Sequence, residues 1–246
     1  MRTKFLSIAL MAFVVLMSSC KKDSASDKNT ITLSQNSVTL YHNDTYQIDA
    51  RCKDNIAYSS HNEYVASVSA SGFVTAQYVG ETNVSLKSNE DSKTFKVTVA
   101  PKSNLYPEPN IEIGESMASV LQKFPKAEIY DDCLFIDEYS NAAPELYIDL
   151  DENRCVEDYE IWVEAEYSSE LNTFIRERYK FLGVEDGIYV FINGLNENTA
   201  TMAVCYEYDS YFEQYAVVYL PLFSKGIDTK ELAASFENIA KKRMNK

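Results

Sequence analysis

Val65-Ala66-Ser67-Val68 and Gly72-Phe73-Val74-Thr75-Ala76 are the two segments that decide how the first part of this chain is expected to fold. In both, apolar residues alternate with small or polar ones, which is the period-two pattern of a strand with one buried face. Similar segments recur about every ten residues, with turn residues between them. We expect strands at residues 30–33, 37–41, 46–50, 64–69, 72–77, 82–87 and 94–99. Short strands at this spacing predict an all-β sandwich.

The order of turns and strands in this region resembles the group 2 bacterial Ig-like domain. That family has a serine-rich turn after an aromatic residue, a Val-Ala-x-Val strand, a glycine that opens the next strand and a glycine before the last hairpin. The matching residues here are Tyr58-Ser59-Ser60, Val65 to Val68, Gly72, Gly80 and the closing Val97-Thr98-Val99. The family's usual tryptophan is Tyr58 in this chain, and Asn43-Asp44 replaces the glycine of the first turn.

The resemblance implies that residues 30–100 form an N-terminal all-β Ig-like sandwich. Ig-like domains of this group occur in surface adhesins and as spacers in exported proteins, so two roles remain open, a stalk or a ligand-binding domain. His42 and His61 are the only histidines of the chain. Both fall in predicted turns with no second ligand at metal-binding spacing, so we expect plain surface residues there.

The chain begins with the order of a secretory signal. Arg2 and Lys4 precede an apolar run from Phe5 to Met17, and two serines then precede Cys20. The apolar run is shorter than the roughly 20 residues of a membrane-spanning helix. The segment resembles the lipobox of bacterial lipoproteins, which implies cleavage after residue 19 and a diacylglycerol on Cys20. We therefore expect a signal peptide at residues 1–19 and a lipidated, flexible tether at residues 20–29.

The residues after the cysteine bear on the location of the protein. Lys21-Lys22-Asp23 looks like the start of many lipoproteins of the Bacteroidetes, which implies the cell envelope and favours its outer membrane. Two lysines come before the first acidic residue, so the periplasmic and the external face both remain open. The membrane, reached through the lipid anchor, is the first expected partner.

Charge is distributed unevenly along the chain. Residues 1–102 contain 11 basic and 9 acidic residues, a net charge of +2, whereas residues 103–246 contain 12 basic and 28 acidic residues, a net charge of −16. Such an acidic surface repels phosphate backbones. We therefore exclude nucleic acid as a partner.

A second domain is expected over residues 105–246, after prolines that mark a junction crossed by few contacts. Met117, Val120, Leu121 and Phe124 form the apolar stripe of a short helix that Ser116 caps. Strands are expected at residues 127–130, 133–137, 145–150 and 155–167. A second helix begins at Ser168, strands follow at 188–192, 200–208 and 212–220, and a helix closes the chain from Asp228 to about Arg243.

A helix followed by an antiparallel meander, twice over, predicts an α+β domain with helices on an antiparallel sheet and a tandem α-β repeat. Ile113-Gly114-Glu115-Ser116-Met117, with Val120 and Phe124-Pro125, resembles the motif of β-lactamase-inhibitor-protein-like folds. The second copy lacks the glycine and the proline. The resemblance implies protein binding rather than chemistry.

The sequence offers few groups for catalysis. Residues 105–246 contain no histidine, no glycine-rich phosphate loop and no Cys-x-x-Cys pair, so we expect neither an enzyme nor a cofactor. Paired carboxylates of a carbohydrate-acting enzyme remain the alternative. The run from Asp149 to Asn153 matches the opening of a calcium loop with Glu160 at its twelfth position, but Arg154 occupies the position that requires glycine. We expect a hairpin turn there and no metal site.

The cysteines other than Cys20 are Cys52, Cys133, Cys155 and Cys205. An exported protein meets an oxidising environment, but these cysteines lack the density of a disulfide framework. Buried free thiols are favoured over any one bridge. Cys133 and Cys155 in particular should lie two strand spacings apart, about 9 to 10 Å, which is beyond disulfide reach.

Trp162 is the only tryptophan and the one candidate ligand-binding residue. Period-two geometry places it with Glu160 and Glu164 on the face opposite Ile161 and Val163. This predicts an exposed indole among carboxylates, which suits a cationic or sugar ligand. The alternative is that a helix or the Ig-like domain covers this face and Trp162 only packs.

Together these observations predict a lipid-anchored envelope protein whose Ig-like spacer presents an acidic α+β domain for non-covalent binding of a protein or a glycan. The alternatives are a carbohydrate-acting enzyme with paired carboxylates and a structural component of an envelope complex.

Overall fold

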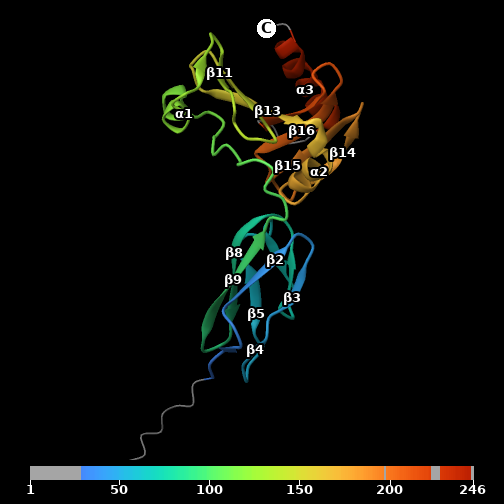
Figure 1. The fold of residues 1–246 in the computed structure, drawn as a ribbon. Helices are drawn as coiled ribbons and strands as arrows, with labels where there is room; N and C mark the ends of the chain where they lie inside the picture. The colour runs from blue at the N-terminus through green and yellow to red at the C-terminus, as the bar shows by residue number, and fades with distance from the viewer. Residues whose placement is uncertain (1–28, 197, 223–227, 245–246) are drawn as a thin grey trace, which may run out of the picture.

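The computed structural model describes residues 29–196, 198–222 and 228–244. The predicted signal peptide, Cys20 and nearly all of the tether lie outside these residues. The described chain forms two domains stacked end to end (Figure 1). The N-terminal domain consists of the nine strands β1 Thr32–Leu33, β2 Ser37–Tyr41, β3 Thr45–Gln47, β4 Ala50–Arg51, β5 Ala57–Ser60, β6 Ala66–Val68, β7 Phe73–Ala76, β8 Gly80–Lys87 and β9 Ser92–Ala100.

The N-terminal strands form the sandwich that the sequence predicts. One sheet has the order β2-β9-β8-β5 and the facing sheet the order β3-β7-β6, with β1 and β4 paired at the end distant from the C-terminal domain (Figure 1). Strands β2 and β9 run parallel and the other pairs antiparallel. Alternate residues of both sheets fill one core, in which Val74, Val84 and Phe95 are fully buried. Burial of this apolar face is the main contribution to the stability of such a sandwich.

Two glycines of this domain cannot be replaced without strain. Gly72 has a φ of +81°, and a Cβ atom built on it would lie 2.8 Å from the ring of Tyr58. Gly80 has a φ of +148°, and its Cβ atom would lie 2.9 Å from the side chain of Val65. Tyr58-Ser59-Ser60 forms part of strand β5 and pairs with β8, so the expected serine-rich turn at this place is wrong. Tyr58 occupies the position of the family's tryptophan and packs directly over Gly72.

The C-terminal domain is largely one eight-stranded antiparallel sheet in the order β10-β11-β12-β13-β17-β16-β15-β14. Its elements are α1 Met117–Lys123, β10 Glu128–Ile129, β11 Cys133–Ile136, β12 Glu145–Leu150, β13 Val156–Glu164, the 3-10 turn η1 Ala165–Tyr167, α2 Ser168–Arg176, β14 Lys180–Glu185, β15 Ile188–Ile192, β16 Met202–Asp209, β17 Gln214–Pro221 and α3 Thr229–Met244. Strand β14 was not expected from the sequence, and the last three residues of the predicted strand 155–167 form η1 instead.

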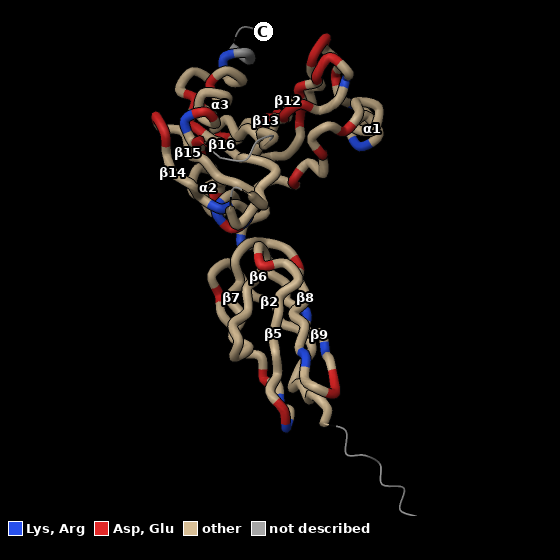
Figure 2. Tube along the Cα trace, turned by 180° about the vertical axis from the view of Figure 1, so that it is seen from behind, with Lys and Arg blue, Asp and Glu red and all other residues tan. Residues whose placement is uncertain are grey.

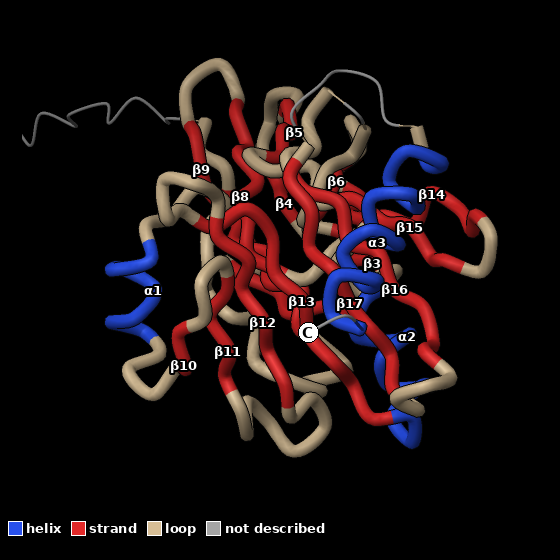
Figure 3. Tube along the Cα trace, turned by 90° about the horizontal axis from the view of Figure 1, so that it is seen from above, coloured by secondary structure: helices blue, strands red, loops and turns tan. Residues whose placement is uncertain are grey.

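Helices cover the two faces of this sheet unequally. Helices α1 and α2 bury Val120, Leu171 and Phe174 against one face, together with Ile148 and Ile161. Among the described helices, α3 lies over the other face on the side of strands β14 to β17, and none lies over strands β10 to β12 there (Figure 3). In the described part of the chain, no helix is long and apolar enough to cross a membrane.

Glu177 is the centre of the contact between the two domains. The residue is 2% exposed. One oxygen accepts the N–H of Lys102 at 2.7 Å, and the other accepts the N–H of Ser103 at 3.0 Å. The latter oxygen also accepts a hydrogen bond from the Arg178 guanidinium at 2.7 Å. Glu177 therefore fixes the backbone of the linker where it leaves the sandwich.

The sandwich itself also contacts the C-terminal domain. The backbone N–H of Val79 donates to the carbonyl of Glu177 at 2.8 Å, and the Tyr64 hydroxyl donates to the carbonyl of Arg178 at 2.6 Å. The ring of Tyr64 stacks on Tyr78 at 4.5 Å, and burial raises the pKa of Tyr64 well above its usual range. The prolines of the junction led us to expect few contacts here, and this expectation is wrong. Several buried or half-buried hydrogen bonds join the Ig-like domain and the linker to the C-terminal domain.

Candidate ligand-binding site

A pocket of about 690 Å³ opens on the face of the large sheet that α3 leaves uncovered. Strands β10 to β13, strand β17 and the turn between β16 and β17 line it. Its lining contains five aromatic side chains, namely Tyr130, Phe135, Tyr147, Trp162 and Phe212. Three carboxylates also line it, Asp131, Asp132 and Glu145, and Ile129, Cys133 and Gln214 complete the wall. We call this site the Trp162 pocket.

Strand register explains why these side chains meet. Phe135 pairs with Tyr147 across β11 and β12, and Glu145 pairs with Trp162 across β12 and β13. Because alternate residues of a strand point to the same face, all four side chains lie on one face of the sheet. The rings of Phe135 and Tyr147 have their centroids 4.8 Å apart. Ala216 is the partner of Trp162 on β17 and is buried.

Trp162 lies on the predicted face, but the predicted exposure is wrong. Its side chain is 3% exposed: it belongs to the same buried cluster as Phe236 of α3, and Phe212 meets it edge to face at 5.0 Å. The alternative expectation of packing under a helix is thus confirmed in part, while the indole still lines the pocket. Its Nε1–H is buried and has no acceptor in the described part of the chain. A buried donor without a partner lowers the stability of the fold, so this N–H group is a candidate to donate to a ligand.

The polar groups of the pocket are mostly acceptors. The Tyr147 hydroxyl donates to Glu145 at 2.9 Å, so this ring turns its oxygen toward a carboxylate. The Tyr130 hydroxyl at the rim donates to Glu128 at 2.8 Å, and this hydrogen bond raises the pKa of Tyr130. No lysine, arginine or histidine is among the described residues that line the pocket. Figure 2 shows acidic residues along the strands and turns at this end of the molecule.

Three further carboxylates lie on the same face of the sheet, beside the pocket. Asp149 and Asp158 pair across β12 and β13, and Glu160 pairs with Tyr147. All three are buried, and each has an interaction partner. Asp149 and Glu160 are thus strand residues. Residues 151–155, between the two strands, form the predicted hairpin turn, in which Asp151 accepts the N–H groups of Asn153 and Cys155 at 2.9 and 2.8 Å.

The two histidines lie in the Ig-like domain, away from this site. His42 lies in a turn and contacts the carbonyl of Gln77, and His61 contacts the Ser85 hydroxyl at 2.5 Å. Among the described residues, no group of three or more histidine, cysteine or carboxylate side chains is arranged to hold a metal ion.

The four described cysteines, Cys52, Cys133, Cys155 and Cys205, form no disulfide, and the expectation that their thiols are buried holds for only two of them. Cys133 and Cys205 are buried, whereas Cys52 and Cys155 are half-buried. Only Cys133 lines the Trp162 pocket.

Sequence reasoning found one residue of this pocket and missed the others. Tyr147 and Glu145 lie on a predicted strand, and their alternation with Leu146 and Ile148 could have placed them on the face of Trp162. Phe212 could not have been found in this way. It lies in the turn that precedes β17, and only the pairing of β13 with β17 brings it to the indole.

Comparison with known protein families gives a match in the N-terminal domain. Residues 25–99 match the family model of the bacterial Ig-like domain (group 2). The N-terminal domain is a bacterial Ig-like domain. The match ends before the linker and does not reach the Trp162 pocket. The matched residues of this bacterial Ig-like domain include Gly72 and Gly80, whose positive φ angles a residue with a side chain rarely adopts.

Two of the similar solved structures are parts of one surface-layer protein. Domains 5–6 of the S-layer protein SbsC are 12% identical, with a TM-score of 0.26, over 80% of this chain and 86% of that chain. Domains 1–6 of the same protein are 11% identical, with a TM-score of 0.28, over 80% of this chain and 26% of that chain. Similarity of this degree does not identify a function. No curated protein sequence matches the chain.

Proposed function

We propose that this chain is a lipid-anchored protein of the bacterial outer membrane that binds a protein or glycan ligand without converting it. The bacterial Ig-like domain acts as the spacer, and the Trp162 pocket of the C-terminal domain holds the ligand. The observation that carries this proposal is the pocket itself. Its volume of about 690 Å³ falls within the range of roughly 300–1,000 Å³ that small-molecule and peptide sites occupy, and aromatic rings dominate its wall.

The arrangement of the domains supports the role of a spacer. The described chain enters the Ig-like domain at the end far from the C-terminal domain and leaves it beside Glu177 (Figure 1). Residue 177 follows α2, and α2 packs on the face of the sheet opposite the pocket. Helix α3, which lies on the same face of the sheet as the pocket, is at the end of the C-terminal domain away from the spacer (Figure 1). The face that contains the pocket is therefore directed away from the spacer. Anchoring at Cys20 would place the membrane at the other end.

The order of elements supports a protein-binding fold. Helix α1 precedes the four strands β10 to β13, and helix α2 precedes the four strands β14 to β17. The last strands of the two halves, β13 and β17, pair antiparallel and join the halves into one sheet. We propose that residues 105–246 form the tandem α-β repeat expected from the sequence, similar to β-lactamase-inhibitor-protein-like folds. Such a likeness implies binding rather than chemistry.

Tryptophan fluorescence tests the proposal directly, because Trp162 is the only tryptophan and lines the pocket. Peptides and oligosaccharides are titrated into the purified protein, and we expect a saturable change in emission with at least one of them. Tyr130→Ala removes a pocket ring that is 52% exposed, so it should weaken binding without unfolding the domain. Tyr41→Ala, which removes a 45% exposed ring of the Ig-like domain, is the matched control and should leave binding unchanged.

Two outcomes would contradict this proposal. One is a ligand panel that leaves the emission of Trp162 and the heat of mixing unchanged. The other is an equal effect of Tyr130→Ala and Tyr41→Ala on binding. A carbohydrate-acting enzyme would instead release shortened sugars from the oligosaccharides, which chromatography of the same mixtures detects.

A further inference from the structure

We propose that the Trp162 pocket takes a basic peptide segment, through a lysine or arginine side chain held between its carboxylates and its aromatic rings. This inference rests on the proposed function and narrows it to one class of ligand. It is carried by four features of the described residues, which are the charge of the wall, the orientation of its hydroxyls, the aromatic faces and the unpartnered indole N–H.

The charge of the wall favours a cation. Asp131 and Glu145 line the pocket, and no described basic side chain lines it. Glu145 is half-buried on β12, so water screens its charge less than that of a surface carboxylate. The C-terminal part of the chain carries a net charge of −16, and that field attracts cations toward the site from a distance.

The hydroxyls of the pocket argue against a neutral sugar. A sugar hydroxyl both donates and accepts, so a sugar site needs donors as well as acceptors. The hydroxyls of Tyr147 and Tyr130 already donate to Glu145 and Glu128. The wall thus presents mainly acceptors. An ammonium or guanidinium group has only donors and matches such a wall.

The rings of the pocket can contact the same cation. Phe135 and Tyr147 lie beside each other with centroids 4.8 Å apart, and Trp162 and Phe212 meet at 75° with centroids 5.0 Å apart. Ammonium and guanidinium groups bind over aromatic faces. Phe212 is 41% exposed and lies in a turn, so its ring can adjust to an incoming side chain.

The indole N–H of Trp162 favours a peptide over a free amine as the ligand. Trp162 Nε1 is buried beside the pocket and has no acceptor among the described residues. A polyamine has only donors and cannot satisfy this group, whereas a peptide brings backbone carbonyls that can. A volume of about 690 Å³ also exceeds what one ammonium group with its chain needs and leaves room for neighbouring residues.

The test uses the emission of Trp162 in the purified full chain with four probes: an alternating Lys-Gly octapeptide, the matching Glu-Gly octapeptide, spermidine and maltoheptaose. We expect the Lys-Gly peptide to bind and the other three to bind at least about tenfold more weakly. Binding should weaken as salt rises from about 0.05 M to about 0.5 M, because the Debye length shortens.

Variants assign the effect to the pocket. Glu145→Gln and Asp131→Asn should each weaken binding of the Lys-Gly peptide by about tenfold or more, the loss of one charge-assisted hydrogen bond. Asp131 is exposed, so its variant stays folded even if Glu145→Gln does not. Glu166→Gln, an exposed carboxylate of η1 outside the pocket, is the control and should bind as the unchanged protein does.

Each contrary result is distinct. Tighter binding of maltoheptaose than of the Lys-Gly peptide, unaffected by Asp131→Asn, would overturn the basic peptide and leave the proposed binding function standing. Binding of spermidine but not of the peptide would also overturn it. No response to any probe, together with none in the wider ligand panel, would overturn the binding function itself.

Discussion

Replacing Glu177 with alanine tests whether the two domains form one rigid unit. The buried carboxylate accepts the N–H groups of Lys102 and Ser103 and pairs with Arg178. Removing one partner of a buried ion pair costs about 3–5 kcal/mol, and the hydrogen bonds cannot be added to this in full because they share the same carboxylate. Arg178 keeps hydrogen bonds to the carbonyls of Phe174 and Ser103, so its charge is not left wholly unpaired. We therefore expect a loss near the lower limit, about 3 kcal/mol.

Urea unfolding followed by tryptophan emission measures this loss, because the only tryptophan reports on the C-terminal domain alone. Glu177→Gln keeps one acceptor oxygen and should lose less than Glu177→Ala. Glu166→Ala, at an exposed carboxylate of η1, is the control and should change the free energy of unfolding by less than about 0.5 kcal/mol. A loss below about 1 kcal/mol for Glu177→Ala, or one equal to that of the control, would refute the reasoning. Small-angle scattering should also show a wider range of domain orientations in Glu177→Ala.

Four further predictions follow from single residues. Cys20→Ser should release the protein from the membrane fraction, and continued membrane association would contradict a lipid anchor at this residue. Mass spectrometry of non-reduced peptides should show no link between Cys133 and Cys155, because both thiols are free on a meander of the predicted order. Burial raises the pKa of Cys205 to about 12, so its thiol should resist iodoacetamide near pH 8.5 while that of half-buried Cys155 reacts. Equal labelling of Cys205 and Cys155 would contradict this difference in reactivity. Because the pKa of Cys205 is higher in the folded than in the unfolded chain, the protonated thiol stabilises the fold fully below about pH 8.5, and this contribution is lost as the pH rises toward 12. Trp162→Ala should lower the free energy of unfolding by about 3–5 kcal/mol because the indole is buried, and a change within error in urea unfolding would contradict its packing.

The sequence predicts the N-terminal domain well because local signals and packing agree there. The alternation around Val65 to Val68, the glycines at 72 and 80 and the turn at Asn43-Asp44 all favour the same sandwich. Asn43 indeed has a φ of +68°, which asparagine tolerates better than most residues. The strand at Tyr58 was missed because two serines follow it, and serine is as common in turns as on the exposed face of a strand.

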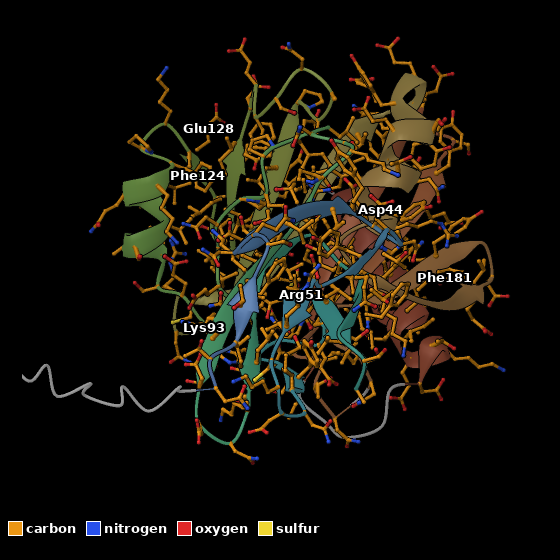
Figure 4. The ribbon with its side chains drawn as sticks, turned by 90° about the horizontal axis from the view of Figure 1, so that it is seen from below. Asp44, Arg51, Lys93, Phe124, Glu128 and Phe181 are labelled. Carbon is orange, nitrogen blue, oxygen red and sulfur yellow. The ribbon has the colours of Figure 1, made fainter. Side chains whose placement is uncertain are left out.

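The C-terminal domain was harder to predict because its main features depend on long-range pairing. Strand β14 contains Gly183, and its edge position leaves Phe181 and Val184 exposed, so it lacks the alternation of a half-buried strand. In Figure 4, Phe181 lies at one side of the molecule and Glu128 at the other, at the two edges of the sheet. The pairing of β13 with β17 decides where Trp162 lies, and nothing local to residue 162 indicates that it joins the buried cluster of α3 and meets Phe212.

The burial of Trp162 changes how this protein should be probed. An exposed indole would allow its removal to report on binding alone, but a buried one couples binding to stability, so truncating Trp162 cannot separate the two. Exposed residues at the rim of the pocket can separate an effect on binding from an effect on stability. Phe212 is 41% exposed and contacts the indole, and Phe73 of the Ig-like domain is 43% exposed and does not line the pocket. If ligands enter beside Phe212, then Phe212→Ala should change affinity and the emission of Trp162 together, while Phe73→Ala changes neither. Equal effects of the two variants would mean that the emission of Trp162 reports on the whole chain and not on the pocket.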